Sequence, residues 1–318
     1  MERLRIAFLG PAASFSHQAA IESFGPSAVF SPCLSFAEAF AAVQHNEVDY
    51  AVIPFENSTN GSVVQTFDLL ADRDGLYCDV VVCGEHYLTV HHCLLARKNA
   101  TTVLSADGGG YHFITKLYSH PQAWGQCEKF LSRYFKKVER QDVSSTSKAA
   151  EIVSADEIGH SAAIASRFAA EYHGAEILEA NIEDKDDNTT RFLILRNDRS
   201  KRTKCAVPIT SDAVDIDGSS EAPTAKWKTL ISFMINHNSP GALADALLIF
   251  KAHGMNLTSI NSRPSQIRAW QYIFFVECES IPGVHDDNSV ERILEGLRKV
   301  TESCRTLGSW KEQILKEV

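Results

Sequence analysis

Residues 4–20, LRIAFLGPAASFSHQAA, decide the fold of the first half of the chain. The first six of them are apolar apart from Arg5, which is typical of a buried strand, and the Gly-Pro pair at 10–11 ends that strand. Ser14 or Ser16 can then cap a helix. The segment therefore predicts a strand, a turn and a helix.

The same order repeats further along the chain. Residues 35–38, SFAE, form a capping box ahead of an apolar stripe at helical spacing. A strand is predicted over residues 50–54, an amphipathic helix over 63–71 and a long strand over 85–96. Alternating strands and helices imply a doubly wound, mainly parallel α/β sheet, which binds ligands at the carboxyl ends of its strands.

The composition narrows the classes of partner. The chain has 318 residues, a formal net charge of −9 and a pI of about 5.7, and phosphate binding needs a basic surface, so we expect no nucleic-acid partner. No stretch approaches the roughly 20 apolar residues of a membrane span. The apolar run near the N-terminus is too short for a signal peptide, so we expect no membrane partner and a cytoplasmic protein.

Eight cysteines are scattered along the chain without a C-x-x-C pair, and we interpret them as reduced, mostly buried thiols. Only residues 91–93, HHC, approach the short ligand spacing of a zinc site. Adjacent strand residues point to opposite faces, which favours ordinary strand residues over metal ligands. We expect no metal and no cofactor.

Further strand and helix units follow and end with a strand over residues 190–195, after which the composition of the chain changes. Residues 197–226 are rich in Asp, Ser, Lys, Thr and Pro and have little apolar periodicity, which predicts a long linker. From Trp227 a ferredoxin-like β-α-β-β-α-β order follows. We expect a doubly wound α/β domain over residues 1–196 and a small domain over 227–318, inclined to pair with a copy of itself.

Four polar segments stand where strands of the first domain end, which is where such sheets bind ligands. In the first, GPAASFSH, Ser14 and backbone N–H groups at a helix N-terminus suit a carboxylate, and simple capping by Ser14 or Ser16 explains the segment equally well. In the second, PFENSTNGS at residues 54–62, the run of short polar side chains exceeds what a turn needs, which favours anion binding.

In the third segment, SHPQAWGQC, Ser119 and Gln126 flank the first turns of a helix, and Ser119 can also be its N-cap. In the fourth, DDNTTRF, Thr190 offers a hydroxyl beside Arg191, whose guanidinium suits a carboxylate. The chain has no G-x-S-x-G elbow, no nucleotide loop and no obvious Cys/His dyad. These residues indicate a site that binds a small polyanion and polarises one bond.

At these segments the chain resembles the prephenate dehydratase family, and the resemblance covers nearly the whole chain in order. The matching motifs are GPAASFSHQAA at 10–20, PFENSTNGSV at 54–63, SHPQAWGQC at 119–127, SSTSKAA at 144–150, NTTRF at 188–192, and the ACT-domain motifs PGAL at 240–243 and NSRP at 261–264.

The resemblance implies a catalytic domain of two α/β lobes with its site in the cleft, like type II periplasmic binding proteins, followed by an ACT domain. It implies conversion of prephenate to phenylpyruvate in phenylalanine biosynthesis, with phenylalanine as the effector. Two positions depart from the family pattern. Ala13-Ser14 replaces Gly-Thr, which removes glycine's freedom at positive φ, and Asn261 stands where glutamate is usual. The long linker is not a standard family feature either.

Prephenate loses its ring carboxylate as CO2 and its 4-hydroxyl as water, and aromatisation drives the reaction. We expect Thr190 to donate to the departing hydroxyl, assisted by Ser119, Gln126 and Asn57. Glu56 would repel a dianion, which favours a loop-bracing role for it. Arg191 suits a carboxylate and can equally be structural. The residues expected at the substrate are Ser14, Ser58, Gly61, Thr146, Arg191 and Phe192.

The effector is expected at the two ACT-domain motifs, and capping by Asn238 or Ser239 is the plain alternative for the first. The residues concerned are Pro240, Gly241, Ala242, Leu243, Asn261, Ser262, Arg263 and Pro264. We expect a homodimer or homotetramer. Because the first strand begins within the first ten residues, we expect no fused chorismate mutase domain.

Two other functions fit the same sequence. Arogenate differs from prephenate by an amine in place of the keto group, so an arogenate dehydratase would need nearly the same site. A two-lobed sensor that binds a small molecule without reacting would share the fold.

Overall fold

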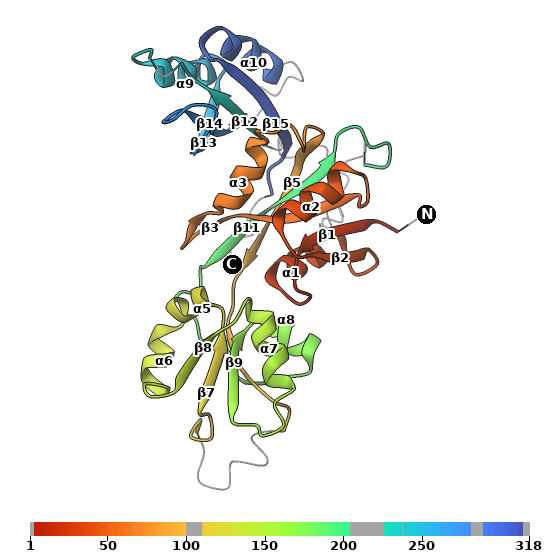
Figure 1. Cartoon of the computed structure of the whole chain (residues 1–318), viewed down its shortest axis with the longest axis vertical. Coiled ribbons are helices and arrows are strands. Elements are labelled where there is room, and N and C mark those ends of the chain that lie inside the picture. The colour runs from red at the N-terminus through yellow and green to blue at the C-terminus, as the bar shows by residue number, and fades with distance from the viewer. Residues whose placement is uncertain (1–2, 100–109, 204–225, 237, 281–288, 314–318) are drawn as a thin grey trace, which may run out of the picture.

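The computed structural model describes residues 3–99, 110–203, 226–236, 238–280 and 289–313. Two sheets organise these residues. In Figure 1 the C-terminal strands lie at the top, a first lobe lies in the middle and a second lobe lies at the bottom. Most of the predicted linker and one of the cysteines fall outside the described residues. No helix within the described residues is long and apolar enough to cross a membrane.

The first lobe is built on the parallel pairing of its first strand, β1, with β2 and β3, which confirms the doubly wound start that the opening segment predicts. β11 lies antiparallel between β3 and β5 because the chain returns there from the second lobe, so this sheet is mixed. The elements are β1 (Arg5–Leu9), α1 (Phe15–Phe24), β2 (Val29–Cys33), α2 (Phe36–Gln44), β3 (Tyr50–Asn57), β4 (Gly61–Ser62), α3 (Val64–Ala71), β5 (Val80–Thr89) and β11 (Thr189–Asn197).

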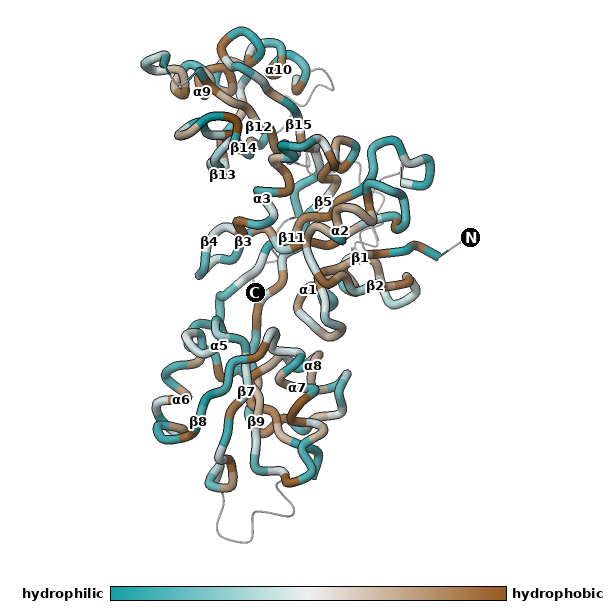
Figure 2. The backbone as a smooth tube through the Cα atoms, in the orientation of Figure 1, coloured by the Kyte–Doolittle hydropathy of each residue, from teal (hydrophilic) through white to brown (hydrophobic). Residues whose placement is uncertain are grey.

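The second lobe has a five-stranded sheet in the order β10-β6-β9-β7-β8. β9 is buried along its whole length, whereas the edge strand β8 is exposed and hydrophilic (Figure 2). The prediction of one strand over residues 85–96 is wrong, because residues 90–92 carry the chain between the lobes. The elements are β6 (Cys93–Ala96), β7 (Lys116–Ser119), α5 (Pro121–Gln126), α6 (Glu128–Tyr134), β8 (Glu139–Asp142), α7 (Thr146–Ser154), β9 (Ser161–Ala165), α8 (Arg167–His173) and β10 (Glu176–Glu179).

The C-terminal unit has the predicted β-α-β-β-α-β order. β15 pairs with β5 through Gly308 and Val82, so the C-terminal strands extend the sheet of the first lobe. A side chain at Gly308 would place its Cβ 2.0 Å from the Val82 carbonyl oxygen, so only glycine allows this approach. The elements are β12 (Trp227–Met234), α9 (Ala242–Ala252), β13 (Met255–Pro264), β14 (Tyr272–Ser280), α10 (Ser289–Val300) and β15 (Ser303–Lys311).

Candidate active site

A cavity of ≈ 590 Å³ lies between the two lobes, and both lobes contribute to its wall. The polar segments after β1 and β3 line one side, and the start of α5 and the loop before α7 line the other. Six of the ten residues predicted for catalysis and substrate binding lie in this wall: Ser14, Asn57, Gly61, Gln126, Thr146 and Thr190.

Neutral groups dominate the wall. No Lys, Arg, Asp or Glu is among the described residues that line the cavity. Instead α1, α3 and α7 begin at the wall, which contains residues 14–16, 63–65 and 144–146. The first N–H groups of a helix have no partner within the helix and carry a partial positive charge. The wall therefore suits an anion that binds without a fixed cation.

Ser14 caps α1 and also lines the cavity. Its hydroxyl accepts a hydrogen bond from the His17 backbone N–H at 3.3 Å and donates to the Leu9 carbonyl oxygen at 3.0 Å. Ala13 adopts the left-handed conformation, with φ of 61°, and its N–H donates to His17 Nδ1 at 3.0 Å. The turn thus keeps a positive φ at Ala13, where the family pattern has glycine.

Asn57, at the end of β3, holds Thr190, at the start of β11. The Asn57 side-chain amide donates to Thr190 Oγ1 at 3.0 Å and to Asn188 Oδ1 at 2.9 Å. Its oxygen accepts from the backbone N–H groups of Thr59 and Asn60, at 3.0 and 2.9 Å. The amide is thereby fixed as a donor to Thr190. The Thr190 hydroxyl can then donate its own proton into the cavity.

His120 lines the cavity beside Gln126 but is not predicted as a site residue from the sequence patterns. Its Nδ1 accepts from the Gln122 backbone N–H at 3.3 Å, so the ring proton sits on Nε2. Burial lowers the pKa of His120, which favours the neutral ring. Its place in the SHPQ segment is the signal that could have identified it.

Three predicted site residues lie outside the wall for simple structural reasons. Ser119 is fully buried and its hydroxyl donates to the Ile164 carbonyl oxygen at 2.8 Å, which ties β7 to β9. Ser58 accepts from the Thr189 backbone N–H at 2.9 Å and so fixes the start of β11. Phe192 is buried in the core of the first lobe.

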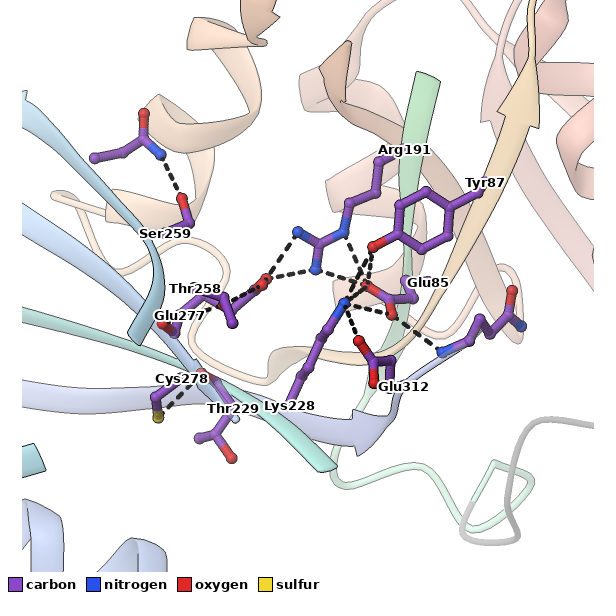
Figure 3. Close-up of polar contacts among 12 residues, drawn as sticks. Glu85, Tyr87, Arg191, Lys228, Thr229, Thr258, Ser259, Glu277, Cys278 and Glu312 are labelled. Atoms are coloured by element: carbon purple, nitrogen blue, oxygen red, sulfur yellow. Dashed lines mark hydrogen bonds and ion pairs between the residues drawn. The ribbon is translucent and has the colours of Figure 1, made fainter. Parts of the chain in front are cut away.

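Arg191 also lies outside the wall, because adjacent residues of a strand point to opposite faces and Thr190 faces the cavity. Its guanidinium pairs with Glu85 of β5 at 2.6 Å and with Glu277 of β14 in the C-terminal unit (Figure 3). Burial alone would lower the pKa of Arg191, but Glu277 and Glu85 raise it overall, so the side chain stays charged. Its position therefore favours the structural alternative.

Lys228 of β12 completes this buried cluster. Its ammonium lies 3.1 Å from Glu85 and donates to the Tyr87 hydroxyl at 3.1 Å (Figure 3). Glu312 lies 3.4 Å from it. The cluster therefore joins two strands of the first lobe to two strands of the C-terminal unit.

The residues predicted for the effector line none of the four described cavities. Two of them contact the first lobe instead. Asn261 accepts from the hydroxyl of Ser62, a residue of the cavity wall, at 2.8 Å. Arg263 pairs with Asp68 of α3 at 2.9 Å. Pro240, Gly241, Ser262 and Pro264 are exposed, Ala242 is buried and Leu243 packs against the C-terminal core.

The described residues contain no group of three or more His, Cys, Asp or Glu side chains that could hold a metal ion. His91 and His92, which sequence spacing brings together, point to different partners. His91 Nδ1 lies 2.7 Å from Glu183, and His92 Nε2 lies 2.7 Å from Gln126.

The chain is similar to known proteins over almost its whole length. The family model of prephenate dehydratase matches residues 6–200. The bifunctional chorismate mutase/prephenate dehydratase of Aquifex aeolicus is 35% identical over 316 residues, which are 99% of this chain and 76% of that protein.

Solved structures share the fold. A prephenate dehydratase from Arthrobacter aurescens in complex with L-Phe has a TM-score of 0.76 and 26% identity, over 97% of this chain and 90% of that one. GqqA, described as a quorum quenching acylase, has a TM-score of 0.74 and 26% identity, over 97% and 98%. By its family-model match and its 35% identity to the Aquifex protein, the chain belongs to the prephenate dehydratase family.

Proposed function

We propose that the cavity between the lobes binds prephenate and converts it to phenylpyruvate, CO2 and water. The bond between the ring and its carboxylate breaks, and its electron pair enters the ring as the C–O bond of the 4-hydroxyl breaks. The departing hydroxide takes a proton to become water. No cofactor is needed, because aromatisation supplies the driving force.

The hydrogen bond from Asn57 to Thr190 is the observation that carries this proposal. A hydroxyl that accepts from a fixed amide is oriented to donate in another direction, here into the cavity. Threonine is far too weak an acid to give up its proton outright. Thr190 therefore stabilises the leaving oxygen by hydrogen bonding or relays a proton to it.

Replacing Thr190 tests this role. We expect Thr190→Ala to lower kcat by about 100- to 1000-fold, the usual effect of losing one donor to developing negative charge, with a much smaller change in KM. Thr190→Ser keeps the hydroxyl and should retain most of kcat. Thr189→Ala is the matched control, since the Thr189 hydroxyl donates to the Asp187 carbonyl oxygen at 3.1 Å. The absorbance of phenylpyruvate reports the rate, and a kcat for Thr190→Ala within a few-fold of wild type would remove the assigned role.

Arogenate is the alternative substrate, and the wall favours prephenate over it. Arogenate carries an ammonium group where prephenate carries a keto oxygen. No carboxylate is among the described wall residues, so nothing there would pair with that ammonium. We expect a higher kcat/KM for prephenate, and a preference for arogenate would contradict this.

Two other functions are weighed against the dehydratase activity. The acylase description belongs to the GqqA structure, and the more similar relatives carry the dehydratase name. A sensor without activity would bind prephenate and release no phenylpyruvate. Turnover of prephenate to phenylpyruvate in the same assay would rule out the sensor.

We further propose that residues 227–318 form a regulatory ACT domain whose effector is phenylalanine, the ligand named with the Arthrobacter structure. Gly241 precedes α9 with φ of 84° and no side-chain cap, which supports an exposed N-terminus for a carboxylate. The contact between Asn261 and Ser62 supports a link from the effector motif to the cavity wall. Phenylalanine titration of activity in Gly241→Ala and Asn261→Ala tests the site, and unchanged inhibition in both would refute it.

We propose that the protein is a cytoplasmic enzyme and a homo-oligomer, and the edge of its sheet supports the second of these. β13 is an edge strand, and its Leu257 and Ile260 are 38% and 49% exposed. We propose that a second copy covers this edge in a dimer or tetramer. Light scattering of the purified chain measures the mass, and a monomer at micromolar concentration would contradict it.

A further inference from the structure

His92 lies behind the cavity wall, on the segment that joins β5 to β6. It is 1% exposed, and its Nε2 lies 2.7 Å from the side-chain oxygen of Gln126, which is part of the wall. Its Nδ1 is buried and has no partner among the described residues. The ring packs edge-on against Phe15, at the start of α1, with 5.8 Å between centroids.

The contact fixes where the ring carries its proton. An amide oxygen can only accept, so His92 Nε2 must donate to Gln126. Burial lowers the pKa of His92, which makes the ring neutral near pH 7, with a single proton. That proton is on Nε2, and the buried Nδ1 keeps a lone pair. Among the described residues Nδ1 has no partner, so the contact with Gln126 is the polar interaction there that orients the ring.

The same contact fixes the direction of the Gln126 amide. Its oxygen is turned away from the cavity toward His92, so its NH2 group is the part left for a bound ligand. A reversed amide would present an oxygen to the substrate and repel a carboxylate. The backbone of Gln126 is also held, because its carbonyl oxygen accepts from the Asp184 N–H at 2.6 Å.

His92 is itself held by the second connection between the lobes. Its backbone N–H donates to the Glu183 carboxylate at 2.9 Å, and its carbonyl oxygen accepts from the Ile182 N–H at 2.9 Å. The backbone of His92 is thus tied to the second segment that crosses between the lobes. The ring can orient Gln126 without touching a ligand, since His92 is not among the residues that line the cavity.

We propose that His92 is a positioning residue of the dehydratase reaction: its Nε2–H holds Gln126 so that the glutamine NH2 donates to an anionic oxygen of the substrate. The proposal rests on the proposed function, in which the cavity that Gln126 lines binds prephenate. It gives the cavity a neutral donor of fixed direction on the second lobe, opposite the Thr190 hydroxyl of the first.

The test compares three single variants and one double variant. His92→Phe keeps the aromatic packing against Phe15 and removes the donor, and we expect kcat/KM to fall about 10- to 100-fold, as for other residues that orient a ligand-binding side chain. His91→Gln is the matched control on the same segment and should stay within a few-fold of wild type, since His91 is half-exposed and its ring contacts Glu183 and not Gln126. Gln126→Ala should lose at least as much as His92→Phe, and the double variant should lose no more than Gln126→Ala alone.

The outcomes separate the two claims. If Gln126→Ala loses activity and His92→Phe adds its full loss in that background, His92 does not act through Gln126 and this inference fails while the proposed function stands. If Gln126→Ala leaves kcat/KM unchanged, the role of Gln126 fails and the inference fails with it. Should His92→Phe not fold, ¹⁵N NMR of the wild-type ring decides: a proton on Nε2 supports the proposal, and a proton on Nδ1 overturns it.

Discussion

Replacing Glu277 by glutamine tests whether the buried ion cluster holds the C-terminal unit to the first lobe. Glu277 is 2% exposed and Arg191 is 7% exposed. One Glu277 oxygen accepts from Arg191 Nη1 at 3.2 Å and from the Thr258 hydroxyl at 2.7 Å, and the other accepts from Arg191 Nη2 (Figure 3). Glutamine has nearly the same size, so the substitution removes the charge and leaves the packing.

The expected cost follows from the charges that remain. Arg191, Lys228, Glu85 and Glu277 are two cations and two anions at less than a tenth exposed, and the substitution removes one of the two carboxylates that pair with Arg191. Removing one partner of a buried pair costs about 3–5 kcal/mol. Arg191 keeps Glu85, so we expect about 3 kcal/mol, which is more than a 100-fold change in the folding equilibrium.

Urea unfolding at pH 7 measures the free energy of unfolding. Glu279→Gln is the matched control two residues further along β14, because Glu279 bonds Asn256 at 2.8 Å and lies 3.7 Å from the half-exposed Lys226. We expect the control to cost less than about 1 kcal/mol. If Glu277→Gln lost no more unfolding free energy than the control, this cluster would not stabilise the contact between the C-terminal unit and the first lobe.

Two further predictions concern the pairing of β15 with β5 and the buried histidines. Gly308→Ala should cost more than about 3 kcal/mol of unfolding free energy, because the new Cβ would clash with the Val82 carbonyl and because residue 308 has a φ of 140°. Wild-type stability of this variant would mean that β15 and β5 do not pair. Burial lowers the pKa of His17 and His92, so below pH 6.5 the unfolded chain binds protons that the folded chain does not, and the free energy of unfolding should fall from pH 7 to pH 5. His92→Phe should reduce that slope by up to about 1.4 kcal/mol per pH unit. Urea unfolding at pH 5, 6 and 7 measures it, and the same pH dependence of the unfolding free energy in the wild type and the variant would contradict the prediction.

The cavity could be predicted from sequence wherever polar residues directly follow an apolar strand. Ser14 and Asn57 stand at such positions, and Thr190 enters a strand beside them in space, so the doubly wound topology brings all three together. Arg191 could not be placed the same way. Its neighbour in sequence faces the cavity, but strand alternation turns Arg191 to the opposite face, and its partner Glu277 is 86 residues away.

Other features depend on tertiary contacts that leave no local signal. The apolar alternation that predicts one strand over residues 85–96 continues through the crossover, and only the presence of a second sheet divides it. Ser119 has the residue type and motif position of a site residue, yet its hydroxyl is used by the Ile164 carbonyl. The role inferred for His92 depends on Gln126, which is 34 residues away.

The absence of cations from the described wall makes chemical sense for this reaction. The ring carboxylate must give up its negative charge as it leaves as CO2, so a fixed arginine or lysine beside it would stabilise the reactant more than the transition state. Only interactions that strengthen toward the transition state raise kcat. Charge builds instead on the departing hydroxyl, where the Thr190 hydroxyl, oriented by Asn57, can donate. Helix N-termini attract a dianion without an ion pair that would oppose decarboxylation.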